Sequence, residues 1–153
     1  MSAPVDYRAN EASAAVLAEH LRRCDAAFVP SLSGRVDISA YARKLAARAE
    51  RFEAWSGGTL VGLVAVYPGD SAQPRAFVTN VSVLPQWQRQ GIAGRLMTAC
   101  VAQAAAQGCR CVELEVDRAN RSAMALYGRL GFAPMAGAGV SAVMRLDIER
   151  KTQ

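Results

Sequence analysis

Histidine and aromatic residues are scarce in this chain, and a long apolar run is missing. His20 is the single histidine among 153 residues, and Phe, Trp and Tyr together make up 7% of them. A histidine-based metal site or a Ser-His-Asp triad therefore has little material. No apolar stretch approaches the roughly 18 residues of a membrane-spanning helix, and the first residues lack the apolar core of a signal peptide. We therefore expect a cytoplasmic protein without a metal or a membrane partner.

Cysteine is also infrequent, and its surroundings favour a structural role. The four cysteines lie mainly in apolar segments that are typical of helices or strands, and Cys109-Arg-Cys111 does not have the spacing of a metal-binding knuckle. We interpret Cys24, Cys100, Cys109 and Cys111 as reduced thiols of the core. His20 lies in a helical segment, and we expect it to have no chemical role.

The overall balance of residues is that of one globular domain. Hydrophobic residues make up 52% of the chain and charged residues 20%, and no linker or repeat divides residues 1–153. The net charge is +5, but the basic residues are scattered and do not line one helix with aromatic residues between them. We therefore expect no nucleic-acid partner. A solvated surface plus one polyanionic small ligand explains the charge equally well.

The order of predicted elements indicates a mixed sheet with helices, which is an α/β (α+β) fold. Segments rich in β-branched and aromatic residues predict strands, and apolar residues three and four apart predict helices. The expected strands are 5–8, 51–55, 60–67, 76–84, 110–116, 132–135 and 140–148. The expected helices are 11–24, 37–50, one that begins after Gly91, and 121–130.

The stretch Gln88-Arg-Gln-Gly-Ile-Ala-Gly-Arg95 is the most informative part of the chain. It joins a predicted strand to a predicted helix, so Gly91 lies at a helix N-terminus, where unpaired N–H groups and the helix dipole favour an anion. Gly91 and Ala93 allow close approach of the backbone, and Arg89 and Arg95 can add charge-assisted hydrogen bonds. The alternative is an ordinary surface turn with solvated arginines.

Two other phosphate-binding turns are excluded. A P-loop requires Gly-Lys-Ser/Thr at the start of its helix, and that lysine is missing here. A dinucleotide-binding fold requires Gly-x-Gly-x-x-Gly and a longer chain to complete its sheet, and this chain has neither.

Two further groups of residues can carry chemistry. Glu113 and Glu115 share one face of the strand 110–116, where carboxylates are costly unless that face is open or the charges are paired. Asn120 and Tyr127 lie two turns apart on the same face of a predicted helix, so one extended ligand can contact both. The simpler alternatives are a helix cap for Asn120, a core aromatic for Tyr127, and ion pairs with arginine for the carboxylates.

Three stretches in this order matter together: Val81-Ser-Val-Leu-Pro-Gln-Trp-Gln-Arg-Gln-Gly-Ile-Ala-Gly-Arg-Leu96, Leu114-Glu-Val, and Asn120-x-x-Ala-x-x-x-Tyr127-x-x-x-Gly131-Phe132. With them, the chain resembles the GNAT superfamily of acyl-CoA-dependent N-acetyltransferases. The local pattern is most similar to the branch with the ribosomal-protein N-terminal and many small-molecule N-acetyltransferases. The resemblance implies a mostly antiparallel central sheet of about seven strands flanked by about four helices. Ala93 stands where many members have a second glycine, a change that the family tolerates.

The resemblance also implies roles for individual residues. Tyr127 would protonate the departing thiolate, and Glu115 would be the general base, with Glu113 or a water molecule as the alternative. The residues expected to bind acetyl-CoA are Val81, Ser82, Val83, Gln88, Arg89, Gln90, Gly91, Ile92, Ala93, Gly94 and Asn120. No metal is implied.

The expected function is transfer of an acetyl group from acetyl-CoA to a primary amine by direct attack in a ternary complex, on a small-molecule acceptor. The alternatives are a protein N-terminal or lysine acetyltransferase, and a sensor that binds acetyl-CoA without catalysis. We expect the segments 25–34 and 67–75 to determine the acceptor, and the short connection 136–139 favours an open acceptor side. An apolar final strand permits a homodimer.

Overall fold

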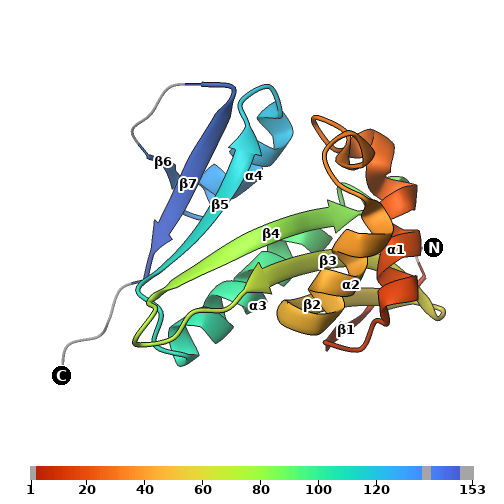
Figure 1. The fold of residues 1–153 in the computed structure, drawn as a ribbon, viewed down its shortest axis with the longest axis horizontal. Coiled ribbons are helices and arrows are strands. Elements are labelled where there is room, and N and C mark those ends of the chain that lie inside the picture. The colour runs from red at the N-terminus through yellow and green to blue at the C-terminus, as the bar shows by residue number, and fades with distance from the viewer. Residues whose placement is uncertain (1–2, 136–138, 149–153) are drawn as a thin grey trace.

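The computed structural model describes residues 3–135 and 139–148, and these form one seven-stranded sheet with helices on both faces (Figure 1). The strands are β1 Asp6–Ala9, β2 Glu50–Ser56, β3 Thr59–Tyr67, β4 Arg75–Val83, β5 Cys111–Asp117, β6 Ala133–Pro134 and β7 Ser141–Asp147. The α-helices are α1 Ala14–Cys24, α2 Ile38–Arg48, α3 Ile92–Ala106 and α4 Arg121–Arg129. Three short 3-10 turns are η1 Asp25–Ala27, η2 Leu32–Gly34 and η3 Pro85–Trp87.

The predicted fold class and element order are confirmed, and local chemistry explains where the elements begin. Helix α1 starts after Ser13, whose side chain accepts a hydrogen bond from the Val16 N–H, so the helix is shorter than predicted. Asp37 caps α2 as expected. Gly57 and Gly58 form the turn between β2 and β3, and both have the positive φ that such a hairpin requires. Of the predicted connection 136–139, residues 136–138 lie outside the described residues.

The strand order is β1-β2-β3-β4-β5-β7-β6, so β1 and β6 are the edges of the sheet. The final strand β7 therefore lies between β5 and β6, and β6 pairs only with Met144 and Arg145 of β7. The homodimer stays a prediction.

The two central strands, β4 and β5, separate partway along their length. They are parallel and paired only from Arg75 with Cys111 to Val78 with Leu114, whereas the other strand pairs are antiparallel. Beyond this point β4 and β5 diverge (Figure 1). The pairing of β3 with β4 also shifts at Thr79, where Ala65 faces Asn80 and Val66 faces Val78. The sheet therefore opens between β4 and β5.

Each face of the sheet has its own apolar core. One core lies between the sheet and α3, and the other lies under α1 and α2. In Figure 1, α1 and α2 cover β2 to β4, while β5 and β7 extend away from them. Gly62 of β3 lies so close to α3 that an added Cβ would come within 2.7 Å of the Ile92 side chain. This close approach fixes the start of α3 against the sheet.

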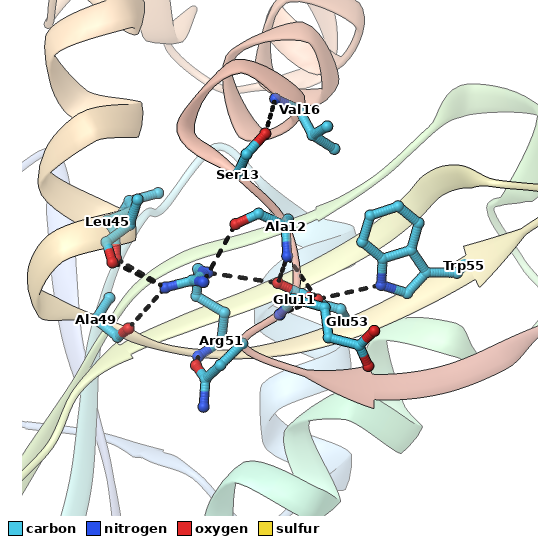
Figure 2. A network of polar contacts seen from close by, with 11 residues as sticks. Glu11, Ala12, Ser13, Val16, Leu45, Ala49, Arg51, Glu53 and Trp55 are labelled. Carbon is cyan, nitrogen blue, oxygen red and sulfur yellow. Dashed lines mark hydrogen bonds and ion pairs between the residues drawn. The ribbon is translucent and has the colours of Figure 1, made fainter.

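A buried ion pair connects β2 to the two helices of the covered face (Figure 2). Glu53 has no exposed surface and accepts hydrogen bonds from the Ala12 N–H at 3.1 Å and the Trp55 Nε1–H at 3.1 Å. Arg51 lies 3.4 Å from Glu53 and donates to main-chain carbonyl oxygens, which belong to Leu45, Ala49 and Ala12. Because both charges are paired and hydrogen-bonded, they hold the start of α1 and the end of α2 on the sheet.

All four cysteines are free and buried, as predicted. Within residues 3–135 and 139–148, no helix is both long and apolar enough to cross a membrane. The same residues contain no group of three metal-ligating side chains.

Candidate functional site

The start of α3 differs from the starts of the other three α-helices. Side-chain oxygens of Ser13, Asp37 and Asn120 cap α1, α2 and α4, but α3 begins at Gly91 with φ +79° and no side-chain cap. Arg89 also has a positive φ, +65°. Left-handed residues in such a turn direct successive N–H groups toward one point, which forms a concave anion site. The loop before α3 therefore has the local geometry predicted for it.

This helix start forms one wall of a cavity of about 440 Å³. The other walls come from the end of β4, from α4 and from the end of α1. The predicted residues that line it are Val81, Ser82, Val83, Gln88, Arg89, Gly91, Ile92, Ala93, Gly94, Asn120 and Tyr127. We call it the donor cavity.

Two residues of the predicted turn do not line the donor cavity. The Gln90 side chain donates to the Gln86 carbonyl oxygen at 3.5 Å. The Arg95 guanidinium lies over the Tyr7 ring, 4.1 Å from its centroid, and so points to β1. The charge-assisted contact expected from Arg95 is therefore not available in this arrangement.

A second cavity of about 430 Å³ lies where β4 and β5 diverge, and we call it the acceptor cavity. Its walls are formed by 28–30, Arg35, 77–81, 115–117 and 140–141, together with residues of α4. Phe28 is part of the segment 25–34 that was expected to determine the acceptor. The predicted contribution of 67–75 is not found among the lining residues.

Five residues line both cavities and mark the place where they meet: Phe28, Val81, Asn120, Ala123 and Tyr127. Tyr127 is 7% exposed, and burial raises its pKa to about 12. Its ring packs edge-to-face against Phe132, and no hydrogen bond to its hydroxyl is found among the described residues. Tyr127 thus holds a proton at neutral pH at the junction of the cavities.

The two carboxylates of β5 have different surroundings although they share a face. Glu113 is buried and receives hydrogen bonds from Arg145 Nε at 2.9 Å and from Arg75 Nη1 at 3.4 Å. Glu115 is exposed, lines the acceptor cavity, and takes part in none of the ion pairs of the described residues. The arginine-paired alternative therefore applies to Glu113, and Glu115 is the carboxylate that can meet a ligand.

Asn120 combines a structural contact with a place at the junction. Its side-chain oxygen accepts from the Ala123 N–H at 3.3 Å, as an N-cap does. Asn120 is therefore a helix cap, which was the simpler alternative. This contact uses the amide oxygen and does not use the N–H donors of the same amide.

The sequence predicts no chemical role for His20, and the structure places it in a buried polar contact with Ser82, which lines the donor cavity. It is 2% exposed, its Nδ1 lies 3.1 Å from the Leu60 carbonyl oxygen, and its Nε2 lies 2.9 Å from Ser82 Oγ. Burial is the main reason that its pKa is lowered to about 4. A signal existed in the sequence, because His20 falls on the apolar stripe formed by Leu17, Leu21 and Cys24.

Comparison with known proteins gives a consistent result. The model of the acetyltransferase (GNAT) family matches residues 15–132. The chain is also 37% identical over 82 residues to N-alpha-acetyltransferase MAK3 of Arabidopsis thaliana. That match covers 53% of this chain and 43% of the plant protein, so it spans less than half of that relative.

Solved structures show the same fold at low sequence identity. The ribosomal-protein-S18-alanine N-acetyltransferase of Escherichia coli superposes with a TM-score of 0.74 at 19% identity, covering 98% of this chain and 97% of that one. A GNAT family acetyltransferase from Brucella melitensis in complex with acetyl-CoA gives 0.71 at 21% identity, with 99% and 93% covered. The fold is therefore shared with proteins that differ in most of their residues.

Proposed function

Because the chain belongs to the acetyltransferase (GNAT) family, we propose that it transfers an acetyl group from acetyl-CoA to a primary amine, with both substrates bound at once. The observation that carries this proposal is the meeting of two cavities at Tyr127, one of which contains an uncapped helix start. A neighbouring structure with this fold holds acetyl-CoA.

The donor cavity suits the phosphate and pantetheine parts of acetyl-CoA. N–H groups between Arg89 and Gly94 would hold the pyrophosphate, since anions bind at uncapped helix starts. Beyond Val78, β4 is no longer paired with β5, so its backbone near Val81 is free on that side to bind pantetheine and the thioester. Asn120 would bind the pantetheine arm, and the thioester would lie at the junction.

The acceptor must lose a proton before it can attack. An alkylamine with a pKa near 10.4 is about three and a half pH units from deprotonation at pH 7, which costs roughly 4.6 kcal/mol. Glu115, directly or through water, would take this proton, because its carboxylate lines the acceptor cavity and has no arginine partner among the described residues. Asp117 adds a second negative charge to the same cavity, so the two carboxylates outnumber the single positive charge of Arg35 and favour a cationic acceptor.

The remaining steps of the acetyl transfer take place at the junction of the two cavities. The amine nitrogen attacks the thioester carbon, and backbone N–H groups near Val81 stabilise the oxyanion. The C–S bond then breaks, and the CoA thiolate takes the proton that the buried Tyr127 hydroxyl holds. The nitrogen, which is positively charged after its attack, releases its second proton to form the amide, and that proton restores the Tyr127 hydroxyl. Since Tyr127 is a weaker acid than a thiol, this transfer depends on a close and well-oriented contact.

We propose a small amine as the acceptor, on the basis of the size of the acceptor cavity, about 430 Å³. A protein N-terminus is the second candidate, and the match to a plant N-alpha-acetyltransferase favours it. A sensor without catalysis is the weakest alternative, because it has no use for both Glu115 and Tyr127 beside the junction.

Release of free CoA thiol from acetyl-CoA tests the proposal. The protein is mixed with amino sugars, polyamines, aminoglycosides, amino acids and N-terminal peptides in separate reactions. Amine-dependent thiol release with a matching acetylated product supports catalysis, and the best acceptor decides between small molecule and peptide. Tight acetyl-CoA binding without product for any amine would favour the sensor.

A further inference from the structure

We propose that a buried chain of three side chains, His20, Ser82 and Asn80, positions the Asn80 amide to bind the acceptor amine. The inference rests on the proposed function and adds a residue on the acceptor side to it. Asn80 would contact the substrate, whereas His20 and Ser82 would act through it as positioning residues.

The chain runs from α1 through β4 to the acceptor cavity. His20 Nε2 lies 2.9 Å from Ser82 Oγ, and Ser82 Oγ lies 2.8 Å from Asn80 Oδ1. His20 is 2% exposed, and Ser82 and Asn80 are each 6% exposed. Ser82 lines the donor cavity and Asn80 lines the acceptor cavity, so the chain reaches both binding sites.

The hydrogen bonds of His20 define which of its nitrogens carries the proton. The Leu60 carbonyl oxygen can only accept, so His20 Nδ1 must donate to it. Burial, and to a smaller extent the charge of Arg23, disfavours the imidazolium. In the neutral ring, Nε2 must therefore accept a hydrogen bond.

Ser82 is the donor that Nε2 requires. Its hydroxyl has one proton and lies close to two acceptors, His20 Nε2 and Asn80 Oδ1, so it can serve only one of them at a time. Cys24 Sγ, at 3.7 Å from Nε2, is a weaker donor. When Ser82 donates to His20, half a turn of the Asn80 amide lets Nδ2 donate to Ser82 and satisfies every member of the chain.

This arrangement gives Asn80 a defined chemical role. Its Oδ1 then takes the position of Nδ2 beside the Tyr41 hydroxyl, and its second lone pair is a hydrogen-bond acceptor on the β4 wall of the acceptor cavity. Glu115 lies on the β5 wall of the same cavity. An amine between these walls would give one N–H to Asn80 and one proton to Glu115, which would direct its lone pair toward the junction.

Steady-state kinetics of single and double variants test the chain, with the best amine from the thiol-release panel as the probe. For Asn80→Ala we expect the amine KM to rise about tenfold, the effect of one lost hydrogen bond, and the acetyl-CoA KM to stay within about twofold. We expect His20→Phe to raise the amine KM about threefold. The double variant should have an amine KM no higher than that of Asn80→Ala alone, because His20 acts through Asn80.

The control separates this role from simple stabilisation of α1. Leu21→Val removes buried volume from the same helix and lines neither cavity, so it should lower the melting temperature and leave the amine KM unchanged. Ser82→Ala interrupts the chain with a smaller change than His20→Phe and should also raise the amine KM. Additive effects of His20→Phe and Asn80→Ala, or an unchanged amine KM in Asn80→Ala, would overturn the proposal.

Nitrogen NMR of the wild-type protein gives a second measurement that needs no turnover. The single histidine should show a neutral ring with the proton on Nδ1 at pH 7, and a proton on Nε2 would overturn the chain. If no amine releases thiol from wild type, the proposed function fails, while the NMR result still decides the state of His20.

Discussion

The donor and acceptor cavities are similar in volume but are built differently. The donor cavity is formed largely by one continuous stretch, 81–94, through its backbone, its glycines and an uncapped helix start. The acceptor cavity is formed by residues from five separate segments and α4, and several of them have polar or charged side chains. A backbone site binds a ligand group that is always the same, whereas a side-chain site can change its ligand by substitution. The two cavities thus explain why the donor can be inferred more firmly than the acceptor.

The largest effect is expected at Tyr127, one of the five residues that line both cavities. Tyr127→Phe removes the hydroxyl that protonates the thiolate, so kcat should fall by about 10²-fold or more. The dissociation constant of acetyl-CoA, measured by calorimetry, should change little, because the ring remains. Tyr7→Phe is the control, since Tyr7 lines neither cavity. Wild-type turnover in Tyr127→Phe would remove Tyr127 from the mechanism.

The two carboxylates of β5 separate a chemical role from a structural one. Glu115→Gln should lower kcat/KM for the amine by about 10 to 100-fold at pH 7, because no group takes the proton of the ammonium. The deficit should shrink as the pH rises toward the amine pKa, since more of the amine is then already neutral. A constant ratio to wild type at all pH values would contradict the role as base.

Glu113→Gln is the matched control for this pair. It breaks the charge pairing with Arg145 and Arg75, so it should lower the melting temperature. It should leave the pH dependence of the amine reaction unchanged. If Glu113→Gln instead removes the pH dependence, Glu113 is the base and the assignment is reversed.

A smaller effect is expected at two helical glycines, of which one faces the donor cavity and the other does not. Gly94 lines the donor cavity, whereas Gly128 of α4 does not, and an added Cβ at either position meets no atom closer than 3.8 Å. Gly94→Ala should raise the acetyl-CoA KM about threefold, because the methyl group keeps the pyrophosphate away from the backbone. Gly128→Ala should leave both KM values unchanged and raise stability by up to about 1 kcal/mol. Equal kinetic effects of the two variants would argue against a backbone-built donor cavity.

The difference between the cavities also explains what the sequence could predict. The strand, the turn and the start of α3 follow one another in the chain, so Gly91 and the helix stripe after it predict the helix start that lines the donor cavity. The alternation along β5 placed Glu113 and Glu115 on one face, but the arginine that selects between them, Arg145, comes from β7. Such pairings depend on sheet order, which local patterns do not determine.

Two other residues show the same limit. Arg95 was expected at the anion site because it follows the turn, yet its guanidinium packs on Tyr7, which reaches α3 only through the folded sheet. His20 is a lone histidine, and its position on the apolar stripe of α1 indicates burial. Burial alone did not reveal Ser82 as its partner, since that contact joins α1 to β4.

The smallest kinetic effect is expected from the ion pair of Figure 2, which lies outside both cavities. Glu53→Gln leaves Arg51 buried without its counter-charge, so the free energy of unfolding should fall by about 3 kcal/mol, measured by urea denaturation. Both KM values and kcat of the folded fraction should stay within about twofold of wild type, because the contacts around Tyr127 do not change. A selective rise of the amine KM would show that the anchoring of α1 and α2 also shapes the acceptor cavity. Strand β2 would then belong to the elements that determine how the acceptor binds.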